Sequence, residues 1–489
     1  MKYYPTMKMV PPLDCIPERS VIEHVLQSFE HCVDLKERAF PENGVRLVYL
    51  GTLTDAKKLA ADVILPFTEL AADEASAHLQ RPPYEKLNAP KEIVAKIVEG
   101  HAAIFHLGEA FAVDLFGPEH RSIQDSKTES VMSGPHEAFV ETLDTNLSLL
   151  RRRIKTSSLK VMRFEVGRIS KTAGYIVYLD GIANGELLGE LVKRVTSVTI
   201  DGIQDTNMLI QVIDDHPHSV FPQFITTERP DVAAAKLLEG KIVGMLDGSP
   251  SAFCAPSGFF EFFQSRDDYG QRWVLATATR MMRYAALIVT LMSTALYVAT
   301  STFHYEMLPD EFLTILTKSR SQVPFPPLYE ALMLEITIEL LREAGARLPN
   351  KIGQTIGIVG GIVIGQAAVS AGFTSNILVI TVAASAIASF VVPSYMMAGA
   401  IRTTRFSFIL LAGLLGNFGI IFALTFLVSH LCGLTNLGSP YMYPVAPMNR
   451  KAWKETLIRG PYRLAGSRKP PPSSAQSEEG EKQGGQKSR

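Results

Sequence analysis

The sequence predicts an α/β cytosolic N-terminal region of two subdomains, followed by an all-α polytopic membrane domain and a disordered tail. Three observations predict this division. Charges are dense and apolar runs short in the first half of the chain, long apolar runs occupy residues 284–434, and most residues after Met448 are polar. The chain is 47 % hydrophobic and 20 % charged overall, and these two kinds of residue are concentrated in different parts of it.

Changes in residue pattern set the predicted domain boundaries. We expect an N-terminal α/β subdomain over residues 1–130, a connecting helix over 131–157, a second α/β subdomain over 158–265, a transmembrane helical domain over 280–434 and a polar C-terminal tail over 448–489. The tail is expected to be disordered from about residue 461, because its prolines, serines, glycines and mixed charges leave too little apolar surface to bury.

Strand and helix patterns alternate through the N-terminal half. Residues 45–50 alternate like a strand, and residues 102–115 resemble a hairpin that turns at Gly108. Residues 159–166 and 174–179 predict a second pair of strands, and stretches of helical spacing separate these pairs. This alternation favours compact α/β subdomains. The first thirty residues hold charges and no apolar signal segment, so we expect this half to stay in the cytosol.

The connecting helix is predicted to open at Gly134-Pro135, since proline is tolerated in a first helical turn. Apolar residues at near-regular spacing continue it, and it ends in Arg151, Arg152 and Arg153, where cations suit the helix dipole. These arginines are interpreted either as a solvated helix end or as a contact to a neighbouring subunit. Further inter-subunit candidates are Glu228, Arg229 and Asp231.

Four stretches are long and apolar enough to cross a hydrocarbon layer about 30 Å thick. They are residues 284–303, 353–373, 376–401 and 406–431. None of them contains Asp, Glu, Lys or Arg, and the last contains His430 near its end. Arg280 and Arg283 precede the first stretch, so the positive-inside rule places that end in the cytosol.

Residues 328–345 form a helix pattern of a different kind, with Glu335, Glu339, Arg342 and Glu343 on one face. Acids at a bilayer centre cost at least about 2.5 kcal/mol each unless they face water or a partner. This helix therefore either lies in the interface or crosses with its charged stripe facing protein or water. Five crossings would place Arg402 and Arg405 in the cytosol and the tail outside, whereas four would place the tail inside.

A repeat of glycines runs along the stretch 353–373. Its members, with the two flanking glutamines, are Gly353, Gln354, Gly357, Gly361, Gly365 and Gln366. Small residues at this spacing allow another helix backbone to approach closely. The stripe is either a helix-packing surface or a pore wall, and a bundle this rich in small residues is expected to form a homo-oligomer within the lipid bilayer.

Several function classes are disfavoured. The 48 basic and 49 acidic residues leave a formal charge of −1, and no basic stripe indicates a nucleic-acid partner. The four cysteines are widely separated, so neither a disulfide framework nor a zinc site is predicted. His216 and His218 flank a proline and are interpreted as polar surface. No phosphate-binding loop, HExxH or GxSxG motif occurs, so we predict no enzyme, no metal and no cofactor.

Longer motifs carry a family resemblance. They include Gly134-Pro135-His136-Glu137, Thr227-Glu228-Arg229-Pro230-Asp231, Gly353-Gln354-Thr355-Ile356-Gly357 and Pro393-Ser394-Tyr395. Together they resemble the GerA family, the A subunits of bacterial spore germination receptors, which includes SpoVAF-type proteins. The resemblance covers roughly residues 130 to 447.

This resemblance implies a multi-pass subunit of a nutrient germinant receptor in the spore inner membrane, with its N-terminal region on the core side. It implies a transporter-like B subunit and a lipoprotein C subunit as partners, and assembly into a nutrient-gated channel that releases monovalent cations. The candidate cation path is then Glu335, Glu339 and Glu343, with Arg342 as their charge partner. The alternatives are a non-conducting scaffold or accessory protein and, less expected, a carrier.

Overall fold

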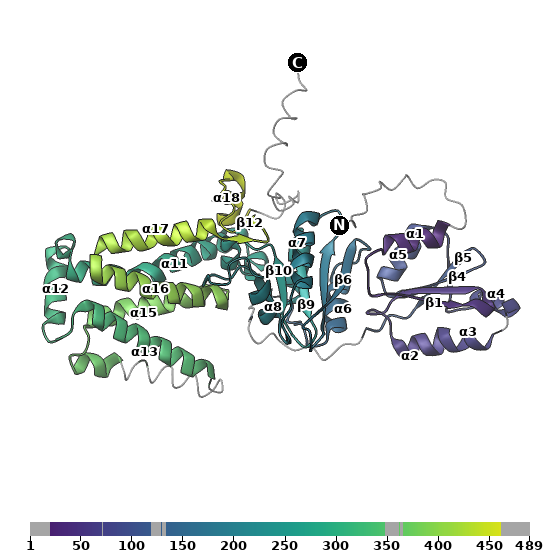
Figure 1. Ribbon diagram of the computed structural model, residues 1–489, viewed down its shortest axis with the longest axis horizontal. Coiled ribbons are helices and arrows are strands. Elements are labelled where there is room, and N and C mark those ends of the chain that lie inside the picture. Colours follow the sequence, from purple (N-terminus) through teal and green to yellow (C-terminus); the bar gives the residue numbers. More distant parts are fainter. Residues whose placement is uncertain are drawn as a thin grey trace, which may run out of the picture.

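The computed structural model describes residues 20–70, 72–118, 129, 134–347, 361 and 365–460. Within these residues, two five-stranded β-sheets and a helical bundle follow one another along the long axis of the molecule (Figure 1). This order agrees with the predicted fold class, an α/β N-terminal region of two subdomains followed by an all-helical part.

The first subdomain is a five-stranded antiparallel sheet with helices on both faces. Its strand order is β1-β2-β4-β5-β3. The strands are β1 (Leu35–Phe40), β2 (Val45–Leu50), β3 (Glu85–Leu87), β4 (His101–His106) and β5 (Glu109–Asp114). Helices α1 (Ser20–Ser28) and α5 (Pro90–Val98) cover one face, and α2 (Ala56–Leu59), α3 (Leu65–Glu69) and α4 (Ala72–Leu79) cover the other.

The second subdomain repeats this topology. Its strands follow the order β6-β7-β9-β10-β8, which is the first order shifted by five. The strands are β6 (Leu159–Val166), β7 (Thr172–Leu179), β8 (Ile225–Thr227), β9 (Ile242–Leu246) and β10 (Ala252–Ala255). Helices α6 (Leu143–Arg153) and α9 (Pro230–Leu238) cover one face, and α7 (Gly185–Thr196) and α8 (Thr206–Ile213) cover the other.

Equivalent helices of the two subdomains share sequence features that the motif search missed. Both α5 and α9 begin with a proline at the first helical position. Both end at a Glu-Gly pair, and Gly100 and Gly240 take left-handed φ angles of +97° and +88°. A glycine just past a helix end closes the helix at little steric cost. The N-terminal region is therefore built from two copies of one structural unit.

Helix α6 starts later than predicted. Residues 134–142 are irregular, and the helix begins at Leu143. The Phe139 N–H bonds the Glu228 carbonyl at 2.7 Å, and the Asn146 side chain bonds both the N–H and the C=O of Val140, at 2.7 and 2.6 Å. Because these backbone groups already have partners elsewhere in the second subdomain, Pro135 does not begin a helix.

Arg151 joins the two subdomains. Its guanidinium is fully buried and forms two hydrogen bonds with the Asp34 carboxylate, at 3.0 and 2.8 Å, and one with the Leu159 carbonyl at 2.8 Å. Beside it, Val33 and Val161 connect the subdomains, because the Val33 N–H bonds the Val161 carbonyl at 3.2 Å. A buried, bidentate ion pair thus fixes the first subdomain against the second.

The helical part comprises long helices packed nearly along one axis (Figure 1). They are α11 (Trp273–Thr302), α13 (Pro327–Arg347), α15 (Asn376–Phe390), α16 (Tyr395–Leu415) and α17 (Asn417–Gly433), with α12 (Asp310–Arg320) across the far end. A short hairpin of β11 (Thr435–Asn436) and β12 (Ser439–Pro440) and the helix α18 (Arg450–Leu457) lie at the near end. By length and composition, α11 and α16 could cross a membrane, and α15 and α17 are shorter apolar helices.

The helix boundaries differ from those predicted after residue 376. The predicted stretch 376–401 is divided after Phe390, and the predicted stretch 406–431 is divided at Gly416, whose φ angle is +62°. Ser394, which follows Pro393, caps α16 by accepting a hydrogen bond from the Met397 N–H. Arg402 and Arg405 therefore lie inside α16 and not between the predicted stretches 376–401 and 406–431.

We predict that replacing Arg151 with leucine loosens the joint between the subdomains. An uncompensated Asp34 carboxylate would remain buried, which costs about 3–5 kcal/mol. Hydrogen exchange of the full chain should show this loss at the Val33 and Val161 amides. The matched control is Arg152→Leu, because Arg152 is 42 % exposed in its side chain and its ion pair contributes less than about 1 kcal/mol. Equal effects of both variants would contradict the assignment.

Candidate functional site: buried charges in the helical bundle

A group of five charged residues lies inside the bundle, and we call it the charge cluster: Glu335, Glu339, Arg342, Arg402 and Arg405. Helix α13 supplies the first three at helical spacing, and α16 supplies the last two. Glu335 and Arg405 are both fully buried, and their Oε2 and Nη2 atoms are 2.6 Å apart. Thr294 of α11 donates a hydrogen bond of 2.9 Å to the other Glu335 oxygen.

Glu339 is shared among the three arginines of the cluster. Its Oε1 atom lies 3.1 Å from Arg342, 3.4 Å from Arg402 and 3.3 Å from Arg405. Helix α15 adds hydroxyl acceptors, because Arg405 donates to Ser385 at 3.0 Å and Arg342 donates to Ser389 at 3.2 Å. The cluster therefore connects α11, α13, α15 and α16.

The formal charge of the cluster is +1, from three guanidinium groups and two carboxylates. A buried carboxylate that is paired in this way is costly to separate from its partner, and its charge is neutralised before it can attract a passing cation. The Nε atoms of Arg342 and Arg405 are buried and, within the described residues, have no hydrogen-bond partner, whereas the Arg402 Nε is the atom 3.4 Å from Glu339. The arrangement is thus able to hold helices together, and its excess charge is positive.

The remaining predicted cation-path residue lies apart from the cluster. Glu343 is exposed and pairs with Arg347 on the next turn of α13, at 2.6 Å. Sequence reasoning missed another buried acid, Glu330, which is fully buried, lies 3.2 Å from Arg320 of α12 and accepts a hydrogen bond of 3.2 Å from the Ser375 N–H. Glu330 lies off the charged face of α13, so the stripe pattern did not reveal it.

The glycine stripe is only partly described. Gly353, Gln354 and Gly357 lie outside the described residues. A side chain added at Gly361 would meet nothing within 4 Å, and one at Gly365 would meet only Val379, at 3.9 Å; Gln366 is exposed. Tight helix contacts occur instead at Gly413 and Gly419 of α16 and α17, where an added Cβ would lie 2.7 Å from Leu328 and 2.0 Å from the Leu411 carbonyl. Gly361 therefore has no close packing partner among the described parts of this chain.

The predicted inter-subunit residues have partners within the chain. Arg151 is buried against Asp34, so neither predicted reading, a solvated helix end or a subunit contact, applies to it. Its position four residues after Leu147, on the apolar face of α6, could have indicated this. Arg152 and Arg153 contact Glu137, at 3.4 and 2.7 Å, and buried Arg229 pairs with Asp231 at 3.0 Å. Glu228 accepts the Phe139 N–H through its carbonyl.

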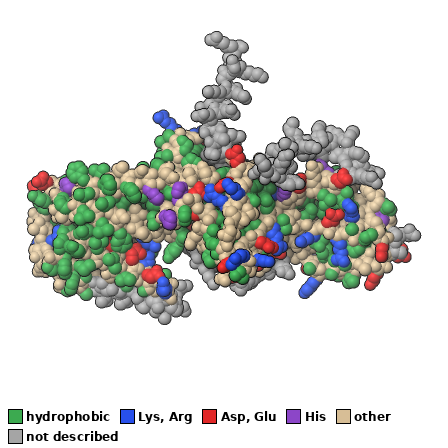
Figure 2. All heavy atoms as spheres, in the orientation of Figure 1, with side chains coloured by type: hydrophobic (Ala, Val, Ile, Leu, Met, Phe, Trp, Pro, Cys, Tyr) green, Lys and Arg blue, Asp and Glu red, His purple; other side chains and the backbone are tan. Residues whose placement is uncertain are grey.

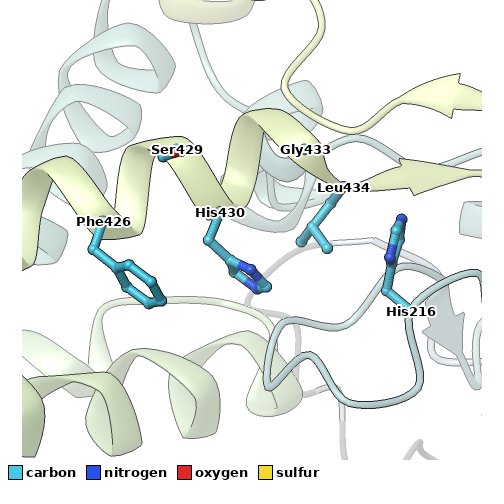
Figure 3. A pocket seen from close by; sticks show the side chains of 6 residues that line it. All are labelled: His216, Phe426, Ser429, His430, Gly433 and Leu434. Carbon is cyan, nitrogen blue, oxygen red and sulfur yellow. The ribbon is translucent and has the colours of Figure 1, made fainter.

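The second subdomain contacts the near end of the bundle through a loop. Ser219 and His430 of α17 are 2.9 Å apart, and the Tyr441 hydroxyl donates to the Pro222 carbonyl at 2.6 Å. His216 and His430 both border a pocket of about 260 Å³, in which Figure 3 shows their rings on opposite sides of Leu434. Among the described residues, no three His, Cys, Asp or Glu side chains gather closely enough to hold a metal ion.

Buried ion pairs strengthen this contact. Asp268 accepts hydrogen bonds from Arg283 at 2.8 Å and Arg280 at 3.4 Å, both in the first turns of α11. Glu261 contacts Lys236 of α9, at 3.0 Å, and Lys241. Burial alone would raise the pKa of the Glu261 carboxyl, but the two lysines lower this pKa to about 2. The segment between the second sheet and α11 is thus fixed to both.

The chain thus combines a duplicated α/β region with an apolar helical bundle, and buried ion pairs join the two. Residues 23–470 match the family "Bacillus/Clostridium GerA spore germination protein". The chain belongs to this family, and the resemblance seen in its sequence motifs is confirmed.

Named relatives match most of the chain in sequence. The chain is 41 % identical to spore germination protein GerQA of Bacillus cereus over 92 % of each chain, and 38 % identical to spore germination protein KA of Bacillus subtilis over 85 % of this chain and 78 % of the other. It is 35 % identical to the uncharacterized membrane protein YfkQ of Bacillus subtilis over 90 % and 88 % of the two chains. The crystal structure of the N-terminal domain of the A subunit of the Bacillus megaterium spore germinant receptor GerK3 matches 49 % of this chain and 94 % of that one, with 23 % identity and a TM-score of 0.38.

We predict that Glu335→Gln destabilises the bundle by about 3–5 kcal/mol, because Arg405 would remain buried without its counter-charge. Glu343→Gln, which breaks an exposed pair on the same helix, should cost less than about 1 kcal/mol. Thermal unfolding of the purified full chain measures both. Replacing Glu335 and Arg405 together with methionine should restore much of the loss, and failure to do so would contradict the pairing.

We also predict a pH-dependent contribution from Asp214. Burial, with Asp215 adding to it, raises the pKa of the Asp214 carboxyl to about 6. The folded state therefore holds this proton more tightly than the unfolded chain, so the contribution of Asp214 to stability is present below pH 4 and is lost as the pH rises to 6. Asp214→Asn should raise the melting temperature at pH 7 and leave it nearly unchanged at pH 4.

The control for this prediction is Asp215→Asn. Arg194 lowers the pKa of the Asp215 carboxyl against the effect of burial, so its stabilising contribution is already present at pH 4. This variant should lower the melting temperature similarly at both pH values. If Asp214→Asn behaves in the same way, Asp214 does not carry the pH dependence.

Proposed function

We propose that the chain is a membrane subunit of a spore nutrient germinant receptor that oligomerises into a nutrient-gated cation channel and triggers germination by ion release. The observation that carries this proposal is membership of the GerA family along most of the chain. The proposal includes no enzymatic step, and its location is the spore inner membrane.

The arrangement of the helices supports an even number of crossings. The start of α11 and the end of α17 both lie at the end of the bundle that faces the second subdomain, because Arg283 bonds the Phe263 carbonyl and Asp268, and His430 contacts Ser219. The segments before and after the bundle therefore lie on one side. Basic residues gather at this end, and by the positive-inside rule they support a cytosolic placement of it; they are Arg272, Arg280, Arg283, Arg450, Lys451, Lys454 and Arg459.

The geometry favours a cation path other than the one first expected. Glu335 and Glu339 are neutralised by arginines, so they support the framework of the subunit. Gly361 is exposed and has open space beside it, and Gln366 on the same segment offers an uncharged polar side chain. We propose that copies of this segment face one another in the oligomer and line the path, because glycine leaves room for water and an amide oxygen can replace part of the hydration shell of a cation.

The test is potassium flux through the full chain reconstituted in liposomes with its partner subunits and the nutrient. The proposed partners are a transporter-like B subunit and a lipoprotein C subunit. Gly361→Leu should abolish most of the flux. Gly345→Leu is the matched control, since a side chain added there also meets nothing within 4 Å, and it should leave the flux unchanged.

Charge at one position tests selectivity. Gln366→Glu should raise the preference for cations over chloride and Gln366→Lys should lower it, in oligomers of unchanged size. Unchanged selectivity in both variants would contradict a path along this face.

The competing function is a non-conducting scaffold or accessory germination protein. The neutralised charge cluster favours it, because the acids of the bundle interior are already occupied by arginines. Absence of flux from a correctly assembled complex that still binds its partners would establish the scaffold and overturn the channel.

A further inference from the structure

The helix α18 and the first turn of α11 form one exposed surface at the near end of the bundle, which we call the basic shelf. Its cations are Arg450, Lys451 and Lys454, and its exposed apolar side chains are Trp273, Val274, Leu275, Met448 and Ile458. Figure 1 shows α18 crosswise to the bundle axis, and Figure 2 shows basic side chains at its free end beside the apolar surface of the bundle.

The shelf is firmly held in place. Arg280 donates hydrogen bonds to the carbonyls of Glu455 and Thr456 at 3.3 and 3.0 Å, and Arg459 donates to the Gln271 carbonyl at 3.3 Å. The Trp453 ring packs edge-on against Phe260, with ring centroids 5.0 Å apart. The orientation of α18 relative to α11 is therefore fixed by several contacts. The side chains of Arg450, Lys451 and Lys454 are exposed in this orientation.

The cations of the shelf are placed against the preference of their own helix. Arg450 and Lys451 occupy the first turn of α18, where the helix dipole is positive and disfavours them, and this turn holds no acidic residue. In the part of the chain that the structure describes, no carboxylate pairs with Arg450, Lys451 or Lys454 within 4 Å. An external anionic partner would supply the missing counter-charge.

The tryptophans indicate which anionic partner this is. The chain contains two tryptophans, Trp273 and Trp453, and both lie on or directly beneath the shelf. Tryptophan is enriched at the level of lipid headgroups, where its ring is half in the apolar layer and its N–H reaches water. The shelf also lies where α11, a helix long enough to cross a membrane, begins. An acidic protein segment would account for the charges but not for this apolar rim.

We propose that the basic shelf binds the headgroups of anionic phospholipids in the leaflet that faces the N-terminal region. This inference rests on the membrane placement in the proposed function and adds the lipid class and the residues that recognise it. Exposed lysines and arginines are attracted to the negative surface of an anionic leaflet, so we expect the lipids beside the shelf to be enriched severalfold in anionic over zwitterionic headgroups.

Tryptophan quenching tests the proposal in the full chain. The protein is reconstituted in nanodiscs of one composition, phosphatidylcholine with phosphatidylglycerol, in which either the first or the second lipid carries bromine near its headgroup end. Trp453→Phe leaves Trp273 as the sole reporter. We expect stronger quenching when the phosphatidylglycerol is brominated, and we expect salt to reduce the difference.

The variant Arg450→Glu/Lys451→Glu/Lys454→Glu should remove this difference. The matched control, Lys57→Glu/Lys91→Glu/Lys193→Glu, makes the same change of charge at exposed lysines of the two α/β subdomains and should preserve it. Equal quenching by both brominated lipids in the Trp453→Phe protein, with the three cations of α18 intact, would overturn the lipid preference while leaving Trp273 at the membrane. Absence of quenching by either lipid would overturn the membrane placement itself, and loss of the difference in the control would overturn the assignment to α18.

Discussion

The pairing of Glu335 with Arg405 is the constraint on which the helical bundle depends. Both side chains are fully buried, so neither could remain charged there alone. The pair fixes α13 against α16, while Thr294 and Ser385 extend the contact to α11 and α15. Glu339, Arg342 and Arg402 then surround the pair at its more exposed side. Opening a path between these helices would require breaking ion pairs, whereas Gly361 and Gln366 are exposed.

Buried ion pairs also lie at three other junctions between parts of the molecule. Arg151 and Asp34 join the two subdomains, Glu261 with its lysines joins the second sheet to the segment before α11, and Asp268 with two arginines joins that segment to the bundle. A buried ion pair is directional, and removing or displacing one partner is costly because the other charge is left buried without compensation. These pairs therefore resist a displacement of one part relative to the next, a property that suits the proposed coupling of a nutrient signal to the membrane helices.

Sequence patterns predicted the longer strands and the order of two subdomains before an apolar helical part, because alternation and long apolar runs are local properties. They failed where long-range pairing decides. Arg402 and Arg405 resembled loop charges because their partners lie on another helix, some 65 residues earlier in the chain. Arg151 resembled a solvated helix end although its spacing placed it on a buried face. The duplication of the subdomains was also missed, since it is carried by strand order and by a few residues around Gly100 and Gly240.

The central claim is that the charge cluster is a buried structural contact that water does not reach, and thiol labelling tests this claim most directly. In a reconstituted chain whose native cysteines are replaced by serine, Ser385→Cys would place a thiol inside the cluster and Gly361→Cys would place one on the proposed path. The account predicts that a charged, membrane-impermeant thiol reagent modifies the cysteine at position 361 and leaves the one at position 385 unreacted. Equal labelling of both would show that water reaches the cluster and would contradict the account.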